Sequence, residues 1–267
     1  MKRKTWFWAL TPVALALSLY GCGNGSDSDL AVDNNAQSCS VVSGTGSAVV
    51  VGSGLPGDPA APEAASGYRL GYKAKQSSNY MVVANTPLAT KAGCDVLKAG
   101  GTAVDAAVAV QAVLGLVEPQ SSTIAGSAFM MYYDAANKKV VAYDGRETAP
   151  AAATGYYLAR QDQSNASSPA PVPSARRSGR SIGVPGVMRM LDMAHKEHGK
   201  LAWAPLFDEG IRLASSGYKI PGRMGDAIRT NAANLQLDAN AVAAYFNADG
   251  TPKTTGTVTT NLPYAQS

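Results

Sequence analysis

Arg146 is the residue whose type and position best suit it to bind a substrate. It follows a β-rich run, residues 139–143, within the sequence Asp144-Gly145-Arg146-Glu147. Loops at strand ends often carry functional side chains on a rigid scaffold, and a planar guanidinium can bind a carboxylate through two parallel hydrogen bonds. The alternative is a surface ion pair with Glu147, which the spacing alone favours because one arginine is weak support for a site.

Three cysteines and two histidines are the other residues that could carry chemistry. His195 and His198 fall in the last turn of a predicted helix, where cations complement the helix dipole. Their spacing is not that of a zinc motif, so we predict no metal and no cofactor. A disulfide between Cys39 and Cys94 is possible, but we favour Cys94 as a small buried side chain of a helix.

The elements that must position Arg146 begin with two helices. Thr86 and Pro87 are typical of a helix start, and Gly100-Gly101 of its end. Thr102 and Asp105 have the spacing of a capping box, which predicts a second helix over residues 103–117. This helix is apolar on nearly every side, so we expect it to be buried.

Two short β-rich runs, residues 128–133 and 139–143, are separated by a turn at residues 134–137, which predicts a hairpin ending near Arg146. Neither run alternates cleanly, so we expect one or both faces to be covered. Farther on, helices are predicted from Gly186 to His198 and over residues 203–215 and 222–237, whereas residues 251–267 are rich in turns. Arg176, Arg177 and Arg180 are interpreted as part of a solvated loop; the alternative is a positive potential that draws anionic substrates.

The first 79 residues are expected to serve export. Residues 1–21 have three basic residues and an apolar run, as in a secretory signal, and Leu19-Tyr20-Gly21-Cys22 resembles a bacterial lipobox in which Cys22 is lipidated. Ordinary cleavage nearby, which leaves a soluble periplasmic protein, is the alternative. Residues 22–79 are predicted to be a flexible tether, with a strand possible at residues 49–51. We expect an exported periplasmic protein that meets the outer membrane only through its lipid.

The chain has 267 residues and a net charge of +4, and removal of the three basic residues near the N-terminus leaves +1. Aromatic residues are few, and no basic stripe interleaves with them. Composition therefore argues against nucleic-acid binding.

Several runs resemble the large-subunit part of gamma-glutamyltransferases, also called glutathione hydrolases. They are KAGGTAVDAAVAV (98–110), FMMYYD (129–134), AYDGRETAPAAAT (142–154), IGVPGVMRMLDMAHKEHGKLAW (182–203) and GIRLASSGYKI (210–220). The resemblance implies an N-terminal-nucleophile hydrolase fold of the α/β (α+β) class, a four-layer αββα sandwich. It also implies that Arg146 binds the α-carboxylate of the γ-glutamyl group of glutathione or related compounds.

The family's nucleophile is a threonine that starts a small subunit after the precursor cuts itself, and the family places it beyond Ser267. The resemblance therefore implies that residues 80–267 are an incomplete large-subunit-like domain, inactive without a small subunit. Ala125 and Ser127 stand where the family has glycines, which puts substrate preference in doubt. The alternatives are a non-catalytic lipoprotein that binds a partner or γ-glutamyl compounds, and a β-lactam acylase of the same fold.

Overall fold

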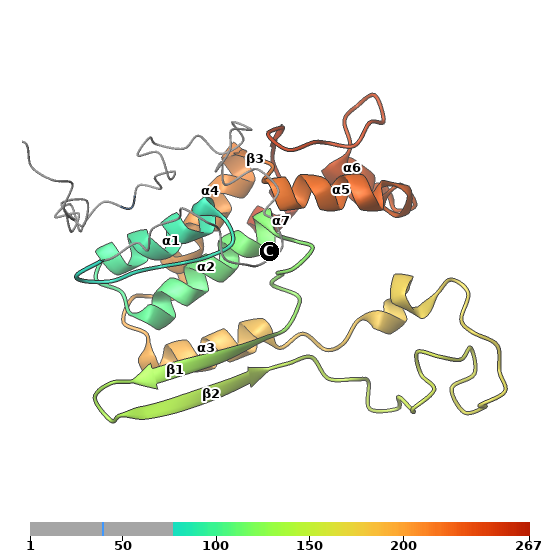
Figure 1. The fold of residues 1–267 in the computed structure, drawn as a ribbon, viewed down its shortest axis with the longest axis horizontal. Coiled ribbons are helices and arrows are strands. Elements are labelled where there is room, and N and C mark those ends of the chain that lie inside the picture. The colour runs from blue at the N-terminus through green and yellow to red at the C-terminus, as the bar shows by residue number, and fades with distance from the viewer. Residues whose placement is uncertain (1–38, 40–76) are drawn as a thin grey trace, which may run out of the picture.

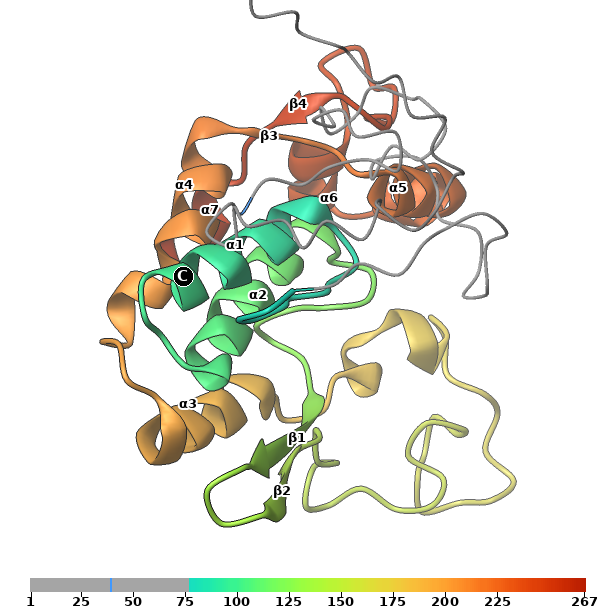
Figure 2. The same ribbon diagram turned by 60° about the vertical axis from the view of Figure 1, so that its left-hand side comes forward.

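The computed structural model describes Cys39 and residues 77–267. Figures 1 and 2 show a group of helices with a long hairpin beside it, which agrees with the predicted mixture of helices and strands. The predicted signal segment, the lipidation of Cys22, the strand at residues 49–51 and nearly all of the predicted tether lie outside the described residues. None of the helices in the described part of the chain is both long and apolar enough to cross a membrane.

Helices α1 (Pro87–Lys98) and α2 (Ala103–Val117) begin where the sequence predicts. The Thr86 side chain accepts a hydrogen bond from the backbone N–H of Ala89, and Thr102 and Asp105 form the predicted capping box. Gly100, just past α1, has a φ of +88°, which a residue without Cβ adopts at little cost. Local capping chemistry therefore sets the bounds of both helices.

Helix α2 lies at the centre of the described chain, as its apolar composition predicts. Val108 and Val113 are fully buried, and each belongs to a different one of the two hydrophobic clusters that pack on this helix. Figure 2 shows α1 along one side of α2, and α3 (Val187–His198) and α4 (Asp208–Ser216) on others. Gly210 of α4 lies so close that a Cβ there would be 3.3 Å from the Ala112 carbonyl oxygen. The small residues of α2 thus permit close helix packing.

Strands β1 (Ala128–Asp134) and β2 (Lys139–Gly145) form the predicted hairpin, in a register that pairs Ala128 with Gly145. Side chains of one face pack with α3 (Val187–His198), which runs along the hairpin in Figure 1. The other face is open within the described chain, so of the two expected outcomes, one covered face or two, the structure shows one. The exposed side chains of the open face are Phe129, Met131, Tyr133 and Val140.

The connection from β2 to α3 is a long loop with two 3-10 turns, η2 (Ala175–Arg177) and η3 (Gly179–Ser181). Arg180 is not a free surface charge, because its guanidinium donates to the carbonyl oxygens of Tyr157 and Arg160 at 3.0 and 2.6 Å. It also donates to the carbonyl oxygen of Gln161 at 2.8 Å. Arg180 therefore holds the loop together, a role that neither sequence interpretation of this residue gave it.

The C-terminal third has more structure than the sequence predicts. The helix expected over residues 203–215 is a 3-10 turn followed by an α-helix. The helix expected over residues 222–237 is present and ends at Leu235, and Asp238 then caps a further helix that was not predicted. Strand β3 (Tyr218–Lys219) pairs with β4 (Val258–Thr259), and of the two only β4 lies in residues 251–267, which were predicted to be rich in turns. The elements are η4 (Ala204–Phe207), α4 (Asp208–Ser216), β3 (Tyr218–Lys219), α5 (Gly222–Leu235), α6 (Ala239–Tyr245), β4 (Val258–Thr259) and α7 (Leu262–Gln266).

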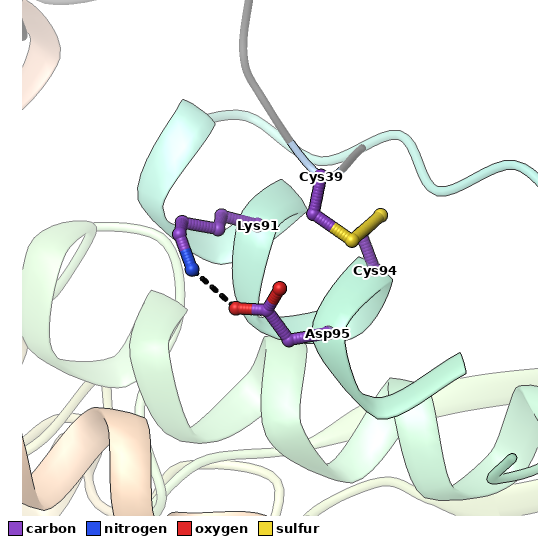
Figure 3. Close-up of a disulfide and its surroundings, with 4 residues drawn as sticks. All are labelled: Cys39, Lys91, Cys94 and Asp95. Atoms are coloured by element: carbon purple, nitrogen blue, oxygen red, sulfur yellow. Dashed lines mark hydrogen bonds and ion pairs between the residues drawn. A yellow bond between two sulfur atoms is a disulfide. The ribbon is translucent and has the colours of Figure 1, made fainter. Parts of the chain in front are cut away.

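A disulfide joins Cys39 to Cys94 of α1, with the two Cα atoms 5.6 Å apart. Figure 3 shows the bridge on the outside of α1, beside the exposed ion pair of Lys91 and Asp95. The preferred interpretation of Cys94 as a free buried side chain is therefore wrong. The outward direction of this helix position allows a partner from another part of the chain.

Candidate functional site

The candidate site is centred on Arg146, the residue that follows β2. Its side chain is 61% exposed, and its Nε lies 3.3 Å from Oε2 of Glu147. The ion pair considered as the alternative is thus present, but it engages the Nε edge of the guanidinium. High exposure leaves the pair without a protein cover, so a ligand carboxylate can approach the guanidinium from solvent.

Ser127 lies beside this ion pair because of the hairpin register. Ala128 pairs with Gly145, so the residue before β1 lies across from the residue after β2. The Nη1 atom of Arg146 is 3.5 Å from the Ser127 hydroxyl oxygen. A hydrogen bond from Ser127, the backbone N–H of Glu147 and the nearby Arg146 charge together hold the pKa of the Glu147 carboxyl below its ordinary value. Glu147 is therefore ionised at neutral pH.

The backbone around Arg146 is fixed by three further contacts. The carboxylate of Asp144 accepts a hydrogen bond from the Arg146 N–H at 2.9 Å. The N–H groups of Gly186 and Val187 both donate to the carbonyl oxygen of Gly126, at 3.1 and 3.2 Å. The start of α3 is thereby joined to the segment just before β1. The turn contact of Asp144 and the start of α3 therefore both hold the backbone at the strand end that carries Arg146.

Replacing Gly186 with alanine is expected to disturb this junction. A Cβ at Gly186 would lie 2.4 Å from the carbonyl oxygen of Gly145, the residue before Arg146. We expect a loss of about 1–3 kcal/mol in the free energy of unfolding, the usual range for overpacking, measured by urea denaturation. Gly155→Ala is the matched control, because a Cβ at Gly155 meets nothing within 4 Å. Equal stability of the two variants would contradict the close contact.

Both histidines lie in the last turn of α3, as predicted. The Nε2–H of His195 donates to the carbonyl oxygen of Leu201 at 2.9 Å, and the ring of His198 stacks on Tyr132 with centroids 4.1 Å apart. These contacts give both rings structural roles. Among the described residues, no group of three or more histidine, cysteine or acidic side chains could hold a metal ion.

Asp105 has a larger role than its sequence position indicates. Its fully buried carboxylate accepts hydrogen bonds from the backbone N–H groups of Thr102, Lys200 and Leu201, and lies 3.3 Å from His195 Nε2. Burial alone raises the pKa of this carboxyl, but the N–H donors outweigh it and leave the pKa below its ordinary value of 3.8. The capping-box spacing predicts the Thr102 contact, whereas no local signal predicts partners 95 residues away.

Three cavities in the described part of the chain are lined by residues other than Arg146. One of them, about 390 Å³ in volume, lies between Trp203, Ile211 and Tyr264. It is mostly apolar and has no charged side chain in its lining. The candidate site is thus an open surface at the end of the hairpin.

The sequence of this chain is similar to that of a known protein family and of several characterised relatives. The sequence model of the family described as gamma-glutamyltranspeptidase matches residues 89–267. The chain is 36% identical over 193 residues to glutathione hydrolase 3 of Arabidopsis thaliana, covering 72% of this chain and 28% of that protein. It is also 36% identical over 175 residues to the glutathione hydrolase proenzyme of Bacillus subtilis, with 64% and 28% covered.

A solved structure shows the same fold. The chain resembles the crystal structure of Helicobacter pylori gamma-glutamyltranspeptidase with a TM-score of 0.66 and 26% identity, over 73% of this chain and 54% of that chain. This likeness confirms the predicted fold class. The chain spans between a quarter and a third of the length of the two curated relatives.

Proposed function

Since the chain belongs to the gamma-glutamyltranspeptidase family, we propose that it is the donor-binding part of an enzyme that cleaves γ-glutamyl amide bonds, as in glutathione. The γ-glutamyl group would pass to water or to an amino-acid or peptide acceptor. The observation that carries this proposal is the open guanidinium of Arg146 at a fixed strand end. A guanidinium is well suited to hold the α-carboxylate of the donor.

In this proposal Arg146 binds and orients the donor, and the nucleophile comes from a second segment. The hydroxyl of an N-terminal threonine attacks the γ-carbonyl carbon while its own α-amine accepts the proton. Backbone or side-chain donors stabilise the oxyanion that forms. The amine product leaves as the acyl-enzyme forms, and water or an acceptor amine then releases the γ-glutamyl group.

The open face of the hairpin supports the need for a second segment. Phe129, Met131, Tyr133 and Val140 are each at least 60% exposed on that face, and no described element covers them. Exposed apolar side chains gathered on one face are typical of an interface. We propose that a small subunit of the same precursor packs there and brings its threonine to Arg146, and that the chain is inactive alone.

Co-expression tests the proposal. The chain is produced with a threonine-initiated small subunit, encoded downstream of Ser267 or taken from the Bacillus subtilis relative, and the purified complex is assayed with γ-glutamyl-p-nitroanilide. We expect release of p-nitroaniline only from the complex. Replacement of the first threonine by alanine is the control, and it should abolish activity without preventing assembly.

A stable complex that shows no activity with any γ-glutamyl compound would contradict the proposed function. If that complex instead hydrolysed the side-chain amide of a β-lactam, the acylase alternative would replace the proposed function. Binding of glutathione by the chain without turnover in the complex would favour a non-catalytic role.

We also propose that the protein is exported and anchored through lipid on Cys22. The Cys39–Cys94 disulfide supports export, because such bonds persist in oxidising compartments. Metabolic labelling with radioactive palmitate tests the anchor, with Cys22→Ser as the control variant. Absence of label from the wild-type protein in the membrane fraction would leave ordinary signal cleavage as the explanation.

A further inference from the structure

We propose that Ser127 is a positioning residue that holds the Arg146–Glu147 pair in the orientation needed to bind a donor carboxylate. This inference rests on the proposed function. It assigns a role to a side chain at a position where the family resemblance led us to expect glycine. Ser127 itself does not touch the reacting atoms.

Ser127 can contact both members of the ion pair at once. Its hydroxyl oxygen lies 3.5 Å from Nη1 of Arg146. A hydrogen bond from the same hydroxyl is the main cause that lowers the pKa of the Glu147 carboxyl. A hydroxyl has one donor and two acceptor lone pairs. It can therefore donate to the carboxylate and accept from the guanidinium in the same arrangement.

The backbone on both sides of Ser127 is held by hydrogen bonds, so the position from which its side chain extends is fixed. On one side, Gly126 accepts hydrogen bonds from the N–H groups of Gly186 and Val187. On the other, Ala128 begins the paired part of β1. Ser127 is half-buried between these anchors, whereas Arg146 is largely exposed and has several rotatable bonds.

The geometry decides which edge of Arg146 remains for a ligand. Glu147 occupies the Nε edge at 3.3 Å and Ser127 lies beside Nη1. The Nη1 and Nη2 nitrogens still have hydrogens directed away from the pair, so a donor carboxylate would bind at the end of the guanidinium. Without the hydroxyl, the Arg146–Glu147 pair would lose the partner that fixes it to the hairpin, and ordering the guanidinium on binding would cost affinity.

Steady-state kinetics of the co-expressed complex tests this role. Ser127→Ala is expected to raise KM for γ-glutamyl-p-nitroanilide about five- to tenfold while kcat changes less than twofold. Ser127→Thr keeps the hydroxyl and should restore KM to within about twofold of wild type. Ser215→Ala, an exposed serine on α4, is the matched control and should leave both constants unchanged.

Nuclear magnetic resonance of the full 267-residue chain gives a second readout that does not need turnover. The ¹⁵N relaxation of the Arg146 Nε, assigned with Arg146→Lys, is expected to show an ordered side chain in the wild type and a mobile one in Ser127→Ala. Titration with glutathione should shift the wild-type signal. These measurements separate positioning from general stability, because Ser215→Ala should retain the ordered signal.

The outcomes distinguish the two proposals. If Ser127→Ala leaves KM and the Nε order unchanged while Arg146→Ala abolishes activity, the role of Ser127 is overturned and the proposed function stands. If the wild-type Nε is ordered through Ser127 but glutathione causes no shift and the complex has no activity, the proposed function fails. If Ser127→Ala lowered kcat by the same factor as it raised KM, the positioning role would also be overturned, because such a change would indicate general damage to the site.

Discussion

Arg146→Ala is expected to lower kcat/KM for γ-glutamyl donors by at least about 100-fold in the co-expressed complex. Two charge-assisted hydrogen bonds to the donor carboxylate would be lost, and together these contribute about 3 kcal/mol. Arg146→Lys keeps the charge but not the planar fork, so we expect a loss of about tenfold. Stability should change little, because the side chain is 61% exposed and its pair with Glu147 is a surface ion pair.

The matched control for this experiment is Arg229→Ala. Arg229 on α5 is 73% exposed and also pairs with a nearby carboxylate, that of Asp226, at 3.1 Å. Its removal should leave kcat/KM within about twofold of wild type. If Arg146→Ala remained as active as Arg229→Ala, the guanidinium would have no part in donor binding.

Asp105→Asn is expected to be the most destabilising of the single substitutions considered for this chain. The carboxylate accepts from three backbone N–H groups while fully buried. The amide that replaces it would turn an NH₂ group toward either these donors or His195 Nε2, so two donors would face each other. We expect a loss of about 3 kcal/mol or more in the free energy of unfolding, seen as a fall in Tm of roughly 6–12 °C.

Asp95→Asn is the control for the stability experiment. Asp95 on α1 is exposed and pairs with Lys91 at the surface, so its replacement should change the free energy of unfolding by less than about 0.5 kcal/mol. A similar Tm for Asp105→Asn and Asp95→Asn would contradict the role given to the buried carboxylate.

The effect of Asp105→Asn should depend on pH in a known direction. The pKa of Asp105 in the folded chain is below its ordinary value of 3.8. The carboxylate therefore stabilises the fold fully above that value and loses this contribution as the pH falls through its folded pKa. The wild type and the variant should converge in stability in strong acid. A constant difference down to the lowest accessible pH would show that the charge is not responsible.

Local chemistry explains which parts of the fold the sequence could predict. Thr86 and Thr102 cap helices through contacts within three residues, so α1 and α2 were predicted closely. The hairpin followed from two β-rich runs joined by a short turn. These features depend on neighbours along the chain, which a sequence displays directly.

Long-range partners explain most of what could not be predicted. Cys39 and Cys94 are 55 residues apart, and β3 pairs with β4 across the whole of α5 and α6. Nothing local marks Lys200 and Leu201 as donors to Asp105. The apolar runs of the hairpin predicted at least one covered face, and α3 covers one; which face stays open depends on α3, which follows β2 only after a long loop.

The candidate site shows a similar division. The sequence placed Arg146 at a strand end, and the structure agrees. The sequence could also name Glu147 as its ion-pair partner. The position of Ser127 beside Arg146 depends on the hairpin register, which was not fixed by composition. Its importance therefore became visible only once the two strand ends were paired.

The bridge from Cys39 to α1 also determines where a mechanical load would enter the folded domain. If the N-terminus is held at a membrane, a pull travels through Cys39 into α1 at Cys94 and bypasses residues 40–93. Opening the bridge would let the same pull reach the N-terminal end of α1, at Pro87, before any other part of that helix. A thiol reductant would thus change which end of α1 bears the load first.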